Sequence, residues 1–463
     1  MKITTKFYRS LNKENLKKLS FKQKAIESAS FIIFGYGISQ GIRLFGNIIL
    51  TRLLVPELFG LITLARVFIL GLNLFTDIGI GPAIIRSKRS AQSIFLNSAW
   101  TLQIIRSSIL ALFSLLVAYP ISLLYKQPIL IFLIPFIGFT GLINGFKSTS
   151  LFILNKELEQ KKIVYIEVVI QLISLIFTIS IAYYFRNIFA LLIGDVVSSI
   201  IRVFWSHILN KDTRNRFQLE KSSVKEIFSF GKWILIATAM TFLAGQTDRI
   251  LLGKLFSMTI LGVYTIAINF AEIPKEIISK LSSNVIYPLI AKYLDNSREE
   301  LRIKIRNQRG KFLLIIAFLI GIFSSFSDYI IYFLYDERYY KAAWILPLLT
   351  IGMWPFILTT SIDGSLFAIG KPKYHALANF IKFIYMLIAL PISFRFGGFF
   401  GAIIAIVIND IPSYIVINYG LAKEKLSLIS QDTIITFVLI IFTLLLLLLR
   451  SFIGLGMPGM NYI

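Results

Sequence analysis

Long apolar segments recur along the whole chain, and short polar or basic stretches separate them. A helix needs about 20 mostly apolar residues to cross the hydrocarbon core of a bilayer. Segments of that kind lie at 28–50, 58–76, 94–119, 129–146, 163–185, 188–208, 233–252, 260–281, 312–334, 342–369, 375–394, 398–419 and 433–449. The pattern predicts an all-α, polytopic membrane protein with thirteen spans.

Composition leads to the same class of protein. The 463 residues are 56% hydrophobic and 16% charged, with a mean hydropathy of +0.76. A soluble chain of this length could not cover that much apolar surface, so lipid must be part of the solvent. No cysteine is present, and the two histidines, His207 and His375, lie far apart. Disulfides are excluded, and neither a metal site nor a bound cofactor is expected.

The net charge of +24 would suggest a nucleic-acid partner in a soluble protein, but here its distribution matters more. With the N-terminus inside, the inner segments carry 30 Lys and Arg residues and the outer segments carry 8. This asymmetry predicts a cytoplasmic N-terminus, and the basic inner face provides a surface for anionic lipids. A count of thirteen spans would leave the C-terminus outside. Nucleic acid is not expected to bind.

The alternation of basic stretches with groups of apolar segments divides the chain into five parts. Residues 1–27 are basic and polar without a signal-peptide cleavage pattern, so a cytoplasmic arm is expected there. A six-helix lobe is expected at 28–208, a basic cytoplasmic linker at 209–232 and a second six-helix lobe at 233–420. An extra helix and a tail then occupy 421–463.

The two lobes are related by an internal repeat. Residues 49–68 align without a gap to 251–270, with six of twenty positions identical. The identical pairs include Gly60 with Gly262 and Thr63 with Thr265. Each repeat holds an even number of spans, so the twelve core spans form two parallel lobes around an axis along the membrane normal. Parallel halves of this kind are typical of transporters with a substrate site near the midplane.

Four motifs resemble the polysaccharide-exporter branch of the multidrug/oligosaccharidyl-lipid/polysaccharide superfamily, which includes O-antigen, colanic acid and teichuronic acid flippases. They are LTRLLVPELFG at 50–60 with FTDIGIGPAIIR at 75–86, TDRILLGK at 247–254 with LGVYTIA at 261–267, Ile273-Pro274 with Tyr287-Pro288, and AIGKP at 368–372. The resemblance covers roughly residues 28–420.

This resemblance implies a flippase in the cytoplasmic (inner) membrane of a bacterium that moves an undecaprenyl-pyrophosphate-linked oligosaccharide. Alternating access between two six-helix lobes around a cationic cavity is expected, with polysaccharide polymerase machinery as a further partner.

Charges inside the spans indicate where such a cargo would bind. An ionisable residue near the bilayer centre costs about 2.5–3.5 kcal/mol, so it normally faces a cavity or a partner. Gln40, Arg43 and Asn47 share one helix face. Pro274 is expected to interrupt the polar span that carries Glu272 and Lys275.

Arginine binds phosphate oxygens in a bidentate manner and stays charged. The hypothesised cationic cavity is Arg43, Arg66, Arg106, Arg249 and Lys275. Its polar members are Gln40, Asn47, Gln246, Asp248 and Glu272. Each cation has a structural alternative as well. Lys275 can pair with Glu272 or Glu276 of its own helix, and Lys382 can extend to the inner surface.

Other charges suggest gates and ion coupling. Arg52 and Lys254 are expected at the outer rim, and Asp77 at a cytoplasmic helix end, as gate residues. Asp195, Asp363 and Asp410 are candidates for carrying a coupling H⁺ or Na⁺, and each is equally a candidate partner for a buried cation.

Three other functions compete with this one. A multidrug exporter of the same superfamily would need an acidic, apolar cavity, and a lipid II flippase has closely related chemistry. A membrane polysaccharide polymerase or ligase would carry large outer loops with catalytic residues, whereas all outer loops here are short. The chain is therefore not expected to be an enzyme.

Overall fold

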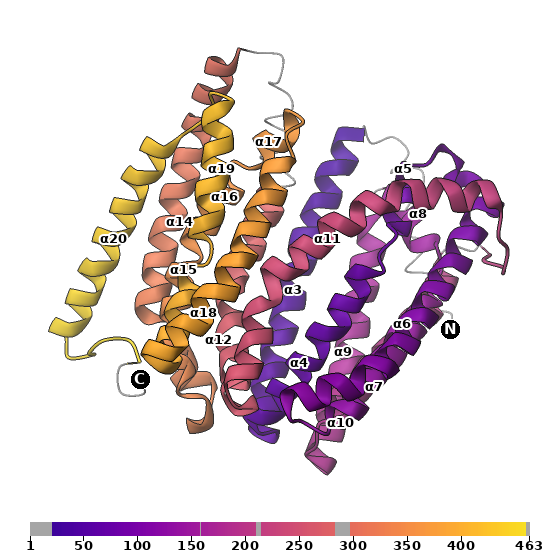
Figure 1. Ribbon diagram of the computed structural model, residues 1–463, viewed down its shortest axis with the longest axis horizontal. Coiled ribbons are helices and arrows are strands. Elements are labelled where there is room, and N and C mark those ends of the chain that lie inside the picture. Colours follow the sequence, from indigo (N-terminus) through magenta and orange to yellow (C-terminus); the bar gives the residue numbers. More distant parts are fainter. Residues whose placement is uncertain (1–20, 158, 210–213, 283–296, 460–463) are drawn as a thin grey trace. The chain divides into compact units, whose positions relative to one another are not determined.

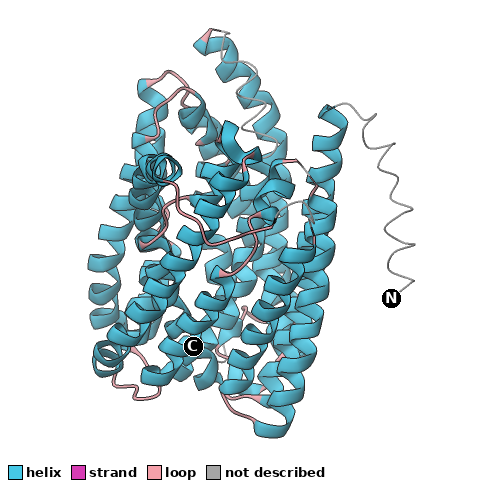
Figure 2. Cartoon of the chain, turned by 90° about the vertical axis from the view of Figure 1, so that its right-hand side faces the viewer, coloured by secondary structure: helices cyan, strands magenta, loops and turns pink. Residues whose placement is uncertain are grey.

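Helices make up the regular structure of the chain. The computed structural model describes residues 21–157, 159–209, 214–282 and 297–459. Within these ranges there is no strand, as Figure 2 shows by its helices and connecting loops. The all-α prediction is confirmed, and every predicted apolar segment falls on one or more helices.

Several of these helices are suited to a membrane by length and composition. Eight helices of the described ranges qualify, or nine if α7 (Leu130–Gly145) and α8 (Ser150–Lys156), bent by 68° at their junction, count as one span. The chain is therefore a multi-pass membrane protein, whereas the count of thirteen spans stays a prediction.

The chain forms two compact units. Unit 1 is Met1–Leu50, Ile78–Ala111 and Gly138–Lys232, and unit 2 is Thr51–Asp77, Leu112–Ile137 and Trp233–Ile463. The predicted lobe and linker boundaries stay a prediction.

Unit 1 is built from short and long helices. It contains most of α3 (Phe21–Leu53), α5 (Ile80–Arg86), the 3-10 helix η1 (Lys88–Ala91), the first part of α6 (Ser93–Tyr125), the last part of α7, α8, α9 (Gln160–Phe185), α10 (Phe189–Ile208) and the start of α11 (Lys221–Leu255). Its core includes Ile84 of α5 and Phe95 of α6, both fully buried. Next to this core the backbone N–H of Glu220 donates to Ser98 Oγ at 2.9 Å, so this end of the basic linker is held against α6.

Unit 2 holds the remaining helices, and Figure 1 labels its α-helices. They are α4 (Pro56–Phe75), the last part of α6, the first part of α7, most of α11 (Lys221–Leu255), α12 (Met258–Leu281), α14 (Arg298–Leu334), the 3-10 helix η3 (Glu337–Tyr339), α15 (Ala342–Gly352), α16 (Trp354–Thr360), α17 (Gly364–Ala368), α18 (Lys373–Val407), α19 (Ile411–Lys423) and α20 (Ile429–Phe452).

The helices α4 and α12, which correspond to the second predicted span of each repeat, pack directly against each other in unit 2. A Cβ on Gly60 would lie 2.0 Å from the Met258 carbonyl oxygen, and one on Gly262 would lie 1.9 Å from the Pro56 carbonyl oxygen. Along the same crossing, the Thr265 hydroxyl donates to the Thr63 hydroxyl at 3.3 Å. Small residues allow helix backbones to approach this closely in a membrane.

Helix α20 lies along α14 and runs in the same direction (Figure 1). Arg309 of α14 pairs with Asp432 of α20, and farther along both helices Asp328 pairs with Arg450 at 2.5 Å. Arg309 and Asp328 are 19 residues apart, or about 28 Å of helix, which is close to the hydrocarbon thickness of a bilayer. The two ion pairs therefore join the helices near their opposite ends.

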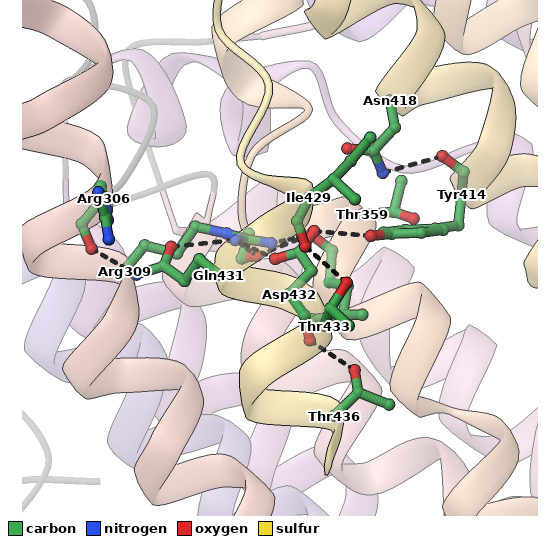
Figure 3. A network of polar contacts seen from close by, with 12 residues as sticks. Arg306, Arg309, Thr359, Tyr414, Asn418, Ile429, Gln431, Asp432, Thr433 and Thr436 are labelled. Carbon is green, nitrogen blue, oxygen red and sulfur yellow. Dashed lines mark hydrogen bonds and ion pairs between the residues drawn. The ribbon is translucent and has the colours of Figure 1, made fainter. Parts of the chain in front are cut away.

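The Arg309 pair belongs to a larger polar network, drawn in Figure 3. Arg309 Nε donates to Ser361 Oγ at 2.7 Å, and Arg309 Nη2 donates to the Leu358 carbonyl at 2.8 Å. On the other side, the Tyr414 hydroxyl donates to Asp432 Oδ2 at 2.9 Å. Both charged side chains are only 2% exposed, and the network satisfies them with partners from four helices.

Two predicted spans are broken in the middle. Proline lacks an N–H and cannot bond to the carbonyl four residues earlier, so Pro355 separates α15 from α16 and Pro412 separates α18 from α19. A Cβ on Gly352 would lie 2.7 Å from the Val407 carbonyl oxygen. The two breaks therefore meet inside unit 2.

Pro274, in contrast, does not break its helix. The sequence predicts an interrupted helix at this residue, but α12 continues through Pro274 to Leu281, so the prediction is wrong. One missing hydrogen bond is tolerated in a membrane helix when its neighbours satisfy the freed carbonyl.

Candidate functional site

A charged cavity lies inside unit 2, where the two broken spans meet. Four helices of the unit contribute to it, α11, α12, α15 and α18, together with the breaks that follow α15 and α18. Its charged lining residues are Asp248, Glu272, Lys275, Lys382 and Asp410. The cavity has a volume of about 30 Å³, which gives room for about two water molecules. This is a site for water-sized species, much smaller than a sugar.

Consecutive residues of α11 point to different partners at one edge of the cavity. Arg249 is 9% exposed, and its Nη2 lies 3.2 Å from both carboxylate oxygens of Glu272 on α12. Its Nη1 donates to Gln246 Oε1 at 2.7 Å. The neighbouring Asp248 accepts the hydroxyl hydrogen bond of Tyr264 through Oδ2. Adjacent positions on a helix face different directions, so this short segment serves two contacts.

The other side of the cavity is a buried ion pair between α18 and the break before α19. Lys382 Nζ lies 2.5 Å from Asp410 Oδ1, and the two residues are 7% and 6% exposed. Lys275 of α12 lies near them, with its Nζ 4.5 Å from the centre of the Phe356 ring. A cation over an aromatic face is attracted by the ring quadrupole. The structural alternatives of Lys275, Glu272 and Glu276, are not its observed partners.

The structure thus brings together six of the residues that the sequence singles out. They are Gln246, Asp248, Arg249, Glu272, Lys275 and Asp410. Their roles in binding and coupling are untested and stay predictions.

The polar face of α3 lies in unit 1. Arg43 is exposed and makes no hydrogen bond or ion pair to another described residue. Gln40 Nε2 donates to the Tyr36 hydroxyl at 2.6 Å, and Asn47 is half-buried. Arg106 of α6 and Asp195 of α10, also in unit 1, are half-buried and have partners of their own. Arg43 is therefore the member of the predicted cation set whose charge is most available to a ligand.

The remaining predicted residues belong to unit 2 but lie outside the cavity lining. Arg66 on α4 and Arg52 at the end of α3 are exposed, and Asp77, after α4, is half-buried. Lys254 Nζ donates to the Leu124 carbonyl at 2.6 Å. Asp363 Oδ2 lies 3.5 Å from His375 Nδ1. The gate and coupling roles of these residues stay predictions.

Sequence reasoning found one buried ion pair only in part and missed two others. It named Asp410 as a candidate partner for a buried cation, and that cation is Lys382, which was expected near the inner surface. It counted Arg309 and Arg450 among loop cations, whereas both side chains are buried against carboxylates. The carboxylates Asp328 and Asp432 were not singled out. A signal was available, because an acid and a base stand at matching ends of the two helices α14 and α20. The paired residues are more than 100 positions apart in sequence, however, and the sequence alone does not show that these two helices are neighbours.

Comparison with known proteins places the chain in a family. Residues 49–343 match the family described as "Polysaccharide biosynthesis protein". Lipopolysaccharide biosynthesis protein WzxC of Escherichia coli is 22% identical over 86% of this chain and 82% of its own length. Teichuronic acid biosynthesis protein TuaB of Bacillus subtilis is 27% identical over 59% of this chain and 57% of its own.

Solved structures show the same fold. The lipid II flippase MurJ in an inward closed conformation has a TM-score of 0.68 at 15% identity, covering 92% of this chain and 98% of its own. An inward-facing multidrug resistance MATE family transporter of the MOP superfamily has a TM-score of 0.59 at 16% identity, over 84% and 94% of the two chains. The resemblance to the polysaccharide-exporter branch is thereby confirmed, and the chain belongs to the polysaccharide biosynthesis protein family.

Proposed function

We propose that this protein moves a polyprenyl-pyrophosphate-linked oligosaccharide across the cytoplasmic membrane during the synthesis of a cell-surface polysaccharide. The observation that carries the proposal is the family match over residues 49–343, in a chain whose fold is shared with MurJ over 92% of its length. The similar solved structures, a lipid II flippase and a multidrug transporter, favour a transporter over an enzyme.

The cargo would carry a negatively charged pyrophosphate, so the cation set predicted from the sequence is central to the mechanism. Arg249 is held by Glu272 and Gln246, which leaves its charge largely compensated. Arg43 has no such partner among the described residues. We therefore assign Arg43 the leading role in binding the pyrophosphate, because arginine pairs with phosphate oxygens in a bidentate manner. Anionic lipids and a polysaccharide polymerase remain proposed partners, and the N-terminus is proposed to be cytoplasmic.

Complementation tests the function directly. The chain is expressed in a strain that lacks its O-antigen flippase, and the surface polysaccharide is measured on gels. Restored polysaccharide is expected, and absence of restoration at a normal protein level would contradict the proposal. A second strain depleted of its lipid II flippase tests the main alternative, since rescue of growth there would favour lipid II as the cargo.

A matched pair of variants tests the role of Arg43. Arg43→Glu is expected to abolish restoration, because a carboxylate repels pyrophosphate, while Arg43→Lys retains part of it. The control is Arg216→Glu, which reverses another exposed arginine of unit 1. Its hydrogen bond to Asn97 Oδ1 comes from the backbone N–H and does not depend on the side chain. Full restoration by Arg43→Glu at a normal protein level would refute the assignment.

A further inference from the structure

The unit 2 cavity combines acids and bases in a way that binding of the cargo does not explain. The Lys382–Asp410 pair lies beside a carboxylate, Asp248, whose Oδ1 is buried and has no hydrogen-bond partner among the described residues. Its Oδ2 is held by the Tyr264 hydroxyl. A buried carboxylate oxygen without a partner is costly, so it points to a small species bound in the cavity.

The charges in this region balance, which limits what that species can be. The carboxylates are Asp248, Glu272 and Asp410, the cations are Arg249, Lys275 and Lys382, and Tyr264 is the remaining titratable group that faces the site. A metal cation would have to share the cavity with two lysine ammonium groups, which repel it in a medium of low dielectric. A proton adds to a carboxylate without needing space of its own, and water in the cavity can conduct it.

The position of the pair links it to a change of shape. α18 consists of two helical segments that meet at the non-helical residue Gly398. Lys382 lies on the first segment and Asp410 follows the second, so their ion pair ties the first segment to the break before α19. The second break, at Gly352 and Met353, lines the same cavity. Breaks in membrane helices are places where transporters bind ions and bend.

We propose that Lys382, Asp410 and Asp248 form a proton-exchange site that couples a proton to the transport cycle. The inference rests on the proposed transport function. When a proton from water forms an O–H bond on Asp410, the carboxylate becomes neutral and the ion pair with Lys382 is lost. The ammonium of Lys382 then turns to the free oxygen of Asp248. Breaking the O–H bond returns the proton to water and restores the original pair.

Infrared difference spectroscopy tests the site without any cargo. The full-length protein is reconstituted in phosphatidylethanolamine–phosphatidylglycerol vesicles, and the carbonyl band of protonated carboxyl groups is followed during acidification. A titrating band is expected that Asp410→Asn removes and that Lys382→Gln moves to higher pH, because loss of an opposite charge favours the neutral acid. Glu276→Gln, an exposed carboxylate of α12 outside the cavity lining, is the matched control and should leave the band unchanged.

A double variant and a change of the cation in the buffer distinguish the outcomes. Lys382→Met/Asp410→Leu removes both charges together and provides a folded reference if a single variant fails to fold; it should also lack the band. Replacing choline with Na⁺ should leave the titration unchanged. A band that survives Asp410→Asn, or a titration that moves with Na⁺ concentration, would overturn the proposal. Titration of Asp410 in a protein that fails to restore polysaccharide would instead refute the transport function and leave the proton site intact.

Discussion

Gly60 and Gly262 occupy equivalent positions in the internal repeat, and they are also in contact. A Cβ added to either glycine would approach the backbone N of the other at 3.1–3.2 Å, and each would collide with a carbonyl oxygen one turn earlier in the opposite helix. The contact is reciprocal, since residues 202 positions apart in sequence exchange roles across it. A local two-fold axis therefore passes between α4 and α12.

Substitution of either glycine by alanine should destabilise this crossing. The added methyl group would lie 1.9–2.0 Å from a carbonyl oxygen, so the two backbones must separate. Overpacking of this kind costs about 1–3 kcal/mol. Thermal unfolding of the purified protein in detergent should show a lower melting temperature for Gly60→Ala and for Gly262→Ala, with a similar change in each.

The control for this prediction is Gly41→Ala, in α3, where an added Cβ meets no atom within 4 Å. Its melting temperature should stay the same or rise, because alanine favours a helix over glycine. Equal melting temperatures for all the variants would show that the close crossing is unimportant for stability.

The internal repeat also shows which parts of the fold the sequence can predict. Periodicity and composition predicted the helices, because lipid imposes one simple rule on every span. The alignment paired Gly60 with Gly262, yet alignment alone does not say whether equivalent helices touch. The breaks at Pro355 and Pro412 were not predicted from the sequence, because the effect of proline was considered only at Pro274, where α12 remains continuous. Whether a proline breaks a membrane helix depends on whether neighbouring groups satisfy the carbonyl that it leaves without a hydrogen bond.

The buried pair of Asp328 and Arg450 should be essential for holding α20 on α14. Arg450 also donates to the Ser325 carbonyl, so its removal leaves several buried groups without partners. Loss of one member of a buried pair costs about 3–5 kcal/mol. Arg450→Met should therefore strongly reduce the yield of folded protein in size-exclusion chromatography, whereas Asp328→Leu/Arg450→Met should recover much of it. A yield of folded protein for the double variant no higher than for Arg450→Met alone would contradict the energetic coupling of this pair.

The parallel course of α14 and α20 predicts the side on which the tail lies. Residues that follow both helices should be on the same face of the membrane, while the loop before α20 should be on the other. The native chain has no cysteine, so single cysteines are unambiguous probes. Glu337→Cys and Leu455→Cys should react together with a membrane-impermeant maleimide added to whole cells. Lys425→Cys should react only after lysis, and opposite behaviour of positions 337 and 455 would contradict the parallel arrangement.

The turn between α14 and α15 should respond to acid. Hydrogen bonds from Arg338 hold the pKa of Asp336 below its usual range, and the same arginine donates to the Thr51 carbonyl at 2.7 Å. Because the folded pKa is lowered, the stabilisation is present above the ordinary carboxyl pKa and is lost as the pH falls through the folded value. The protection of the 336–340 amides, which is their exchange rate relative to the intrinsic rate at the same pH, should therefore be high at neutral pH and fall only in acid. Asp336→Asn should give fast exchange already at neutral pH, with Glu337→Gln as the neighbouring control, and identical profiles for the two variants would exclude this ion pair as the cause.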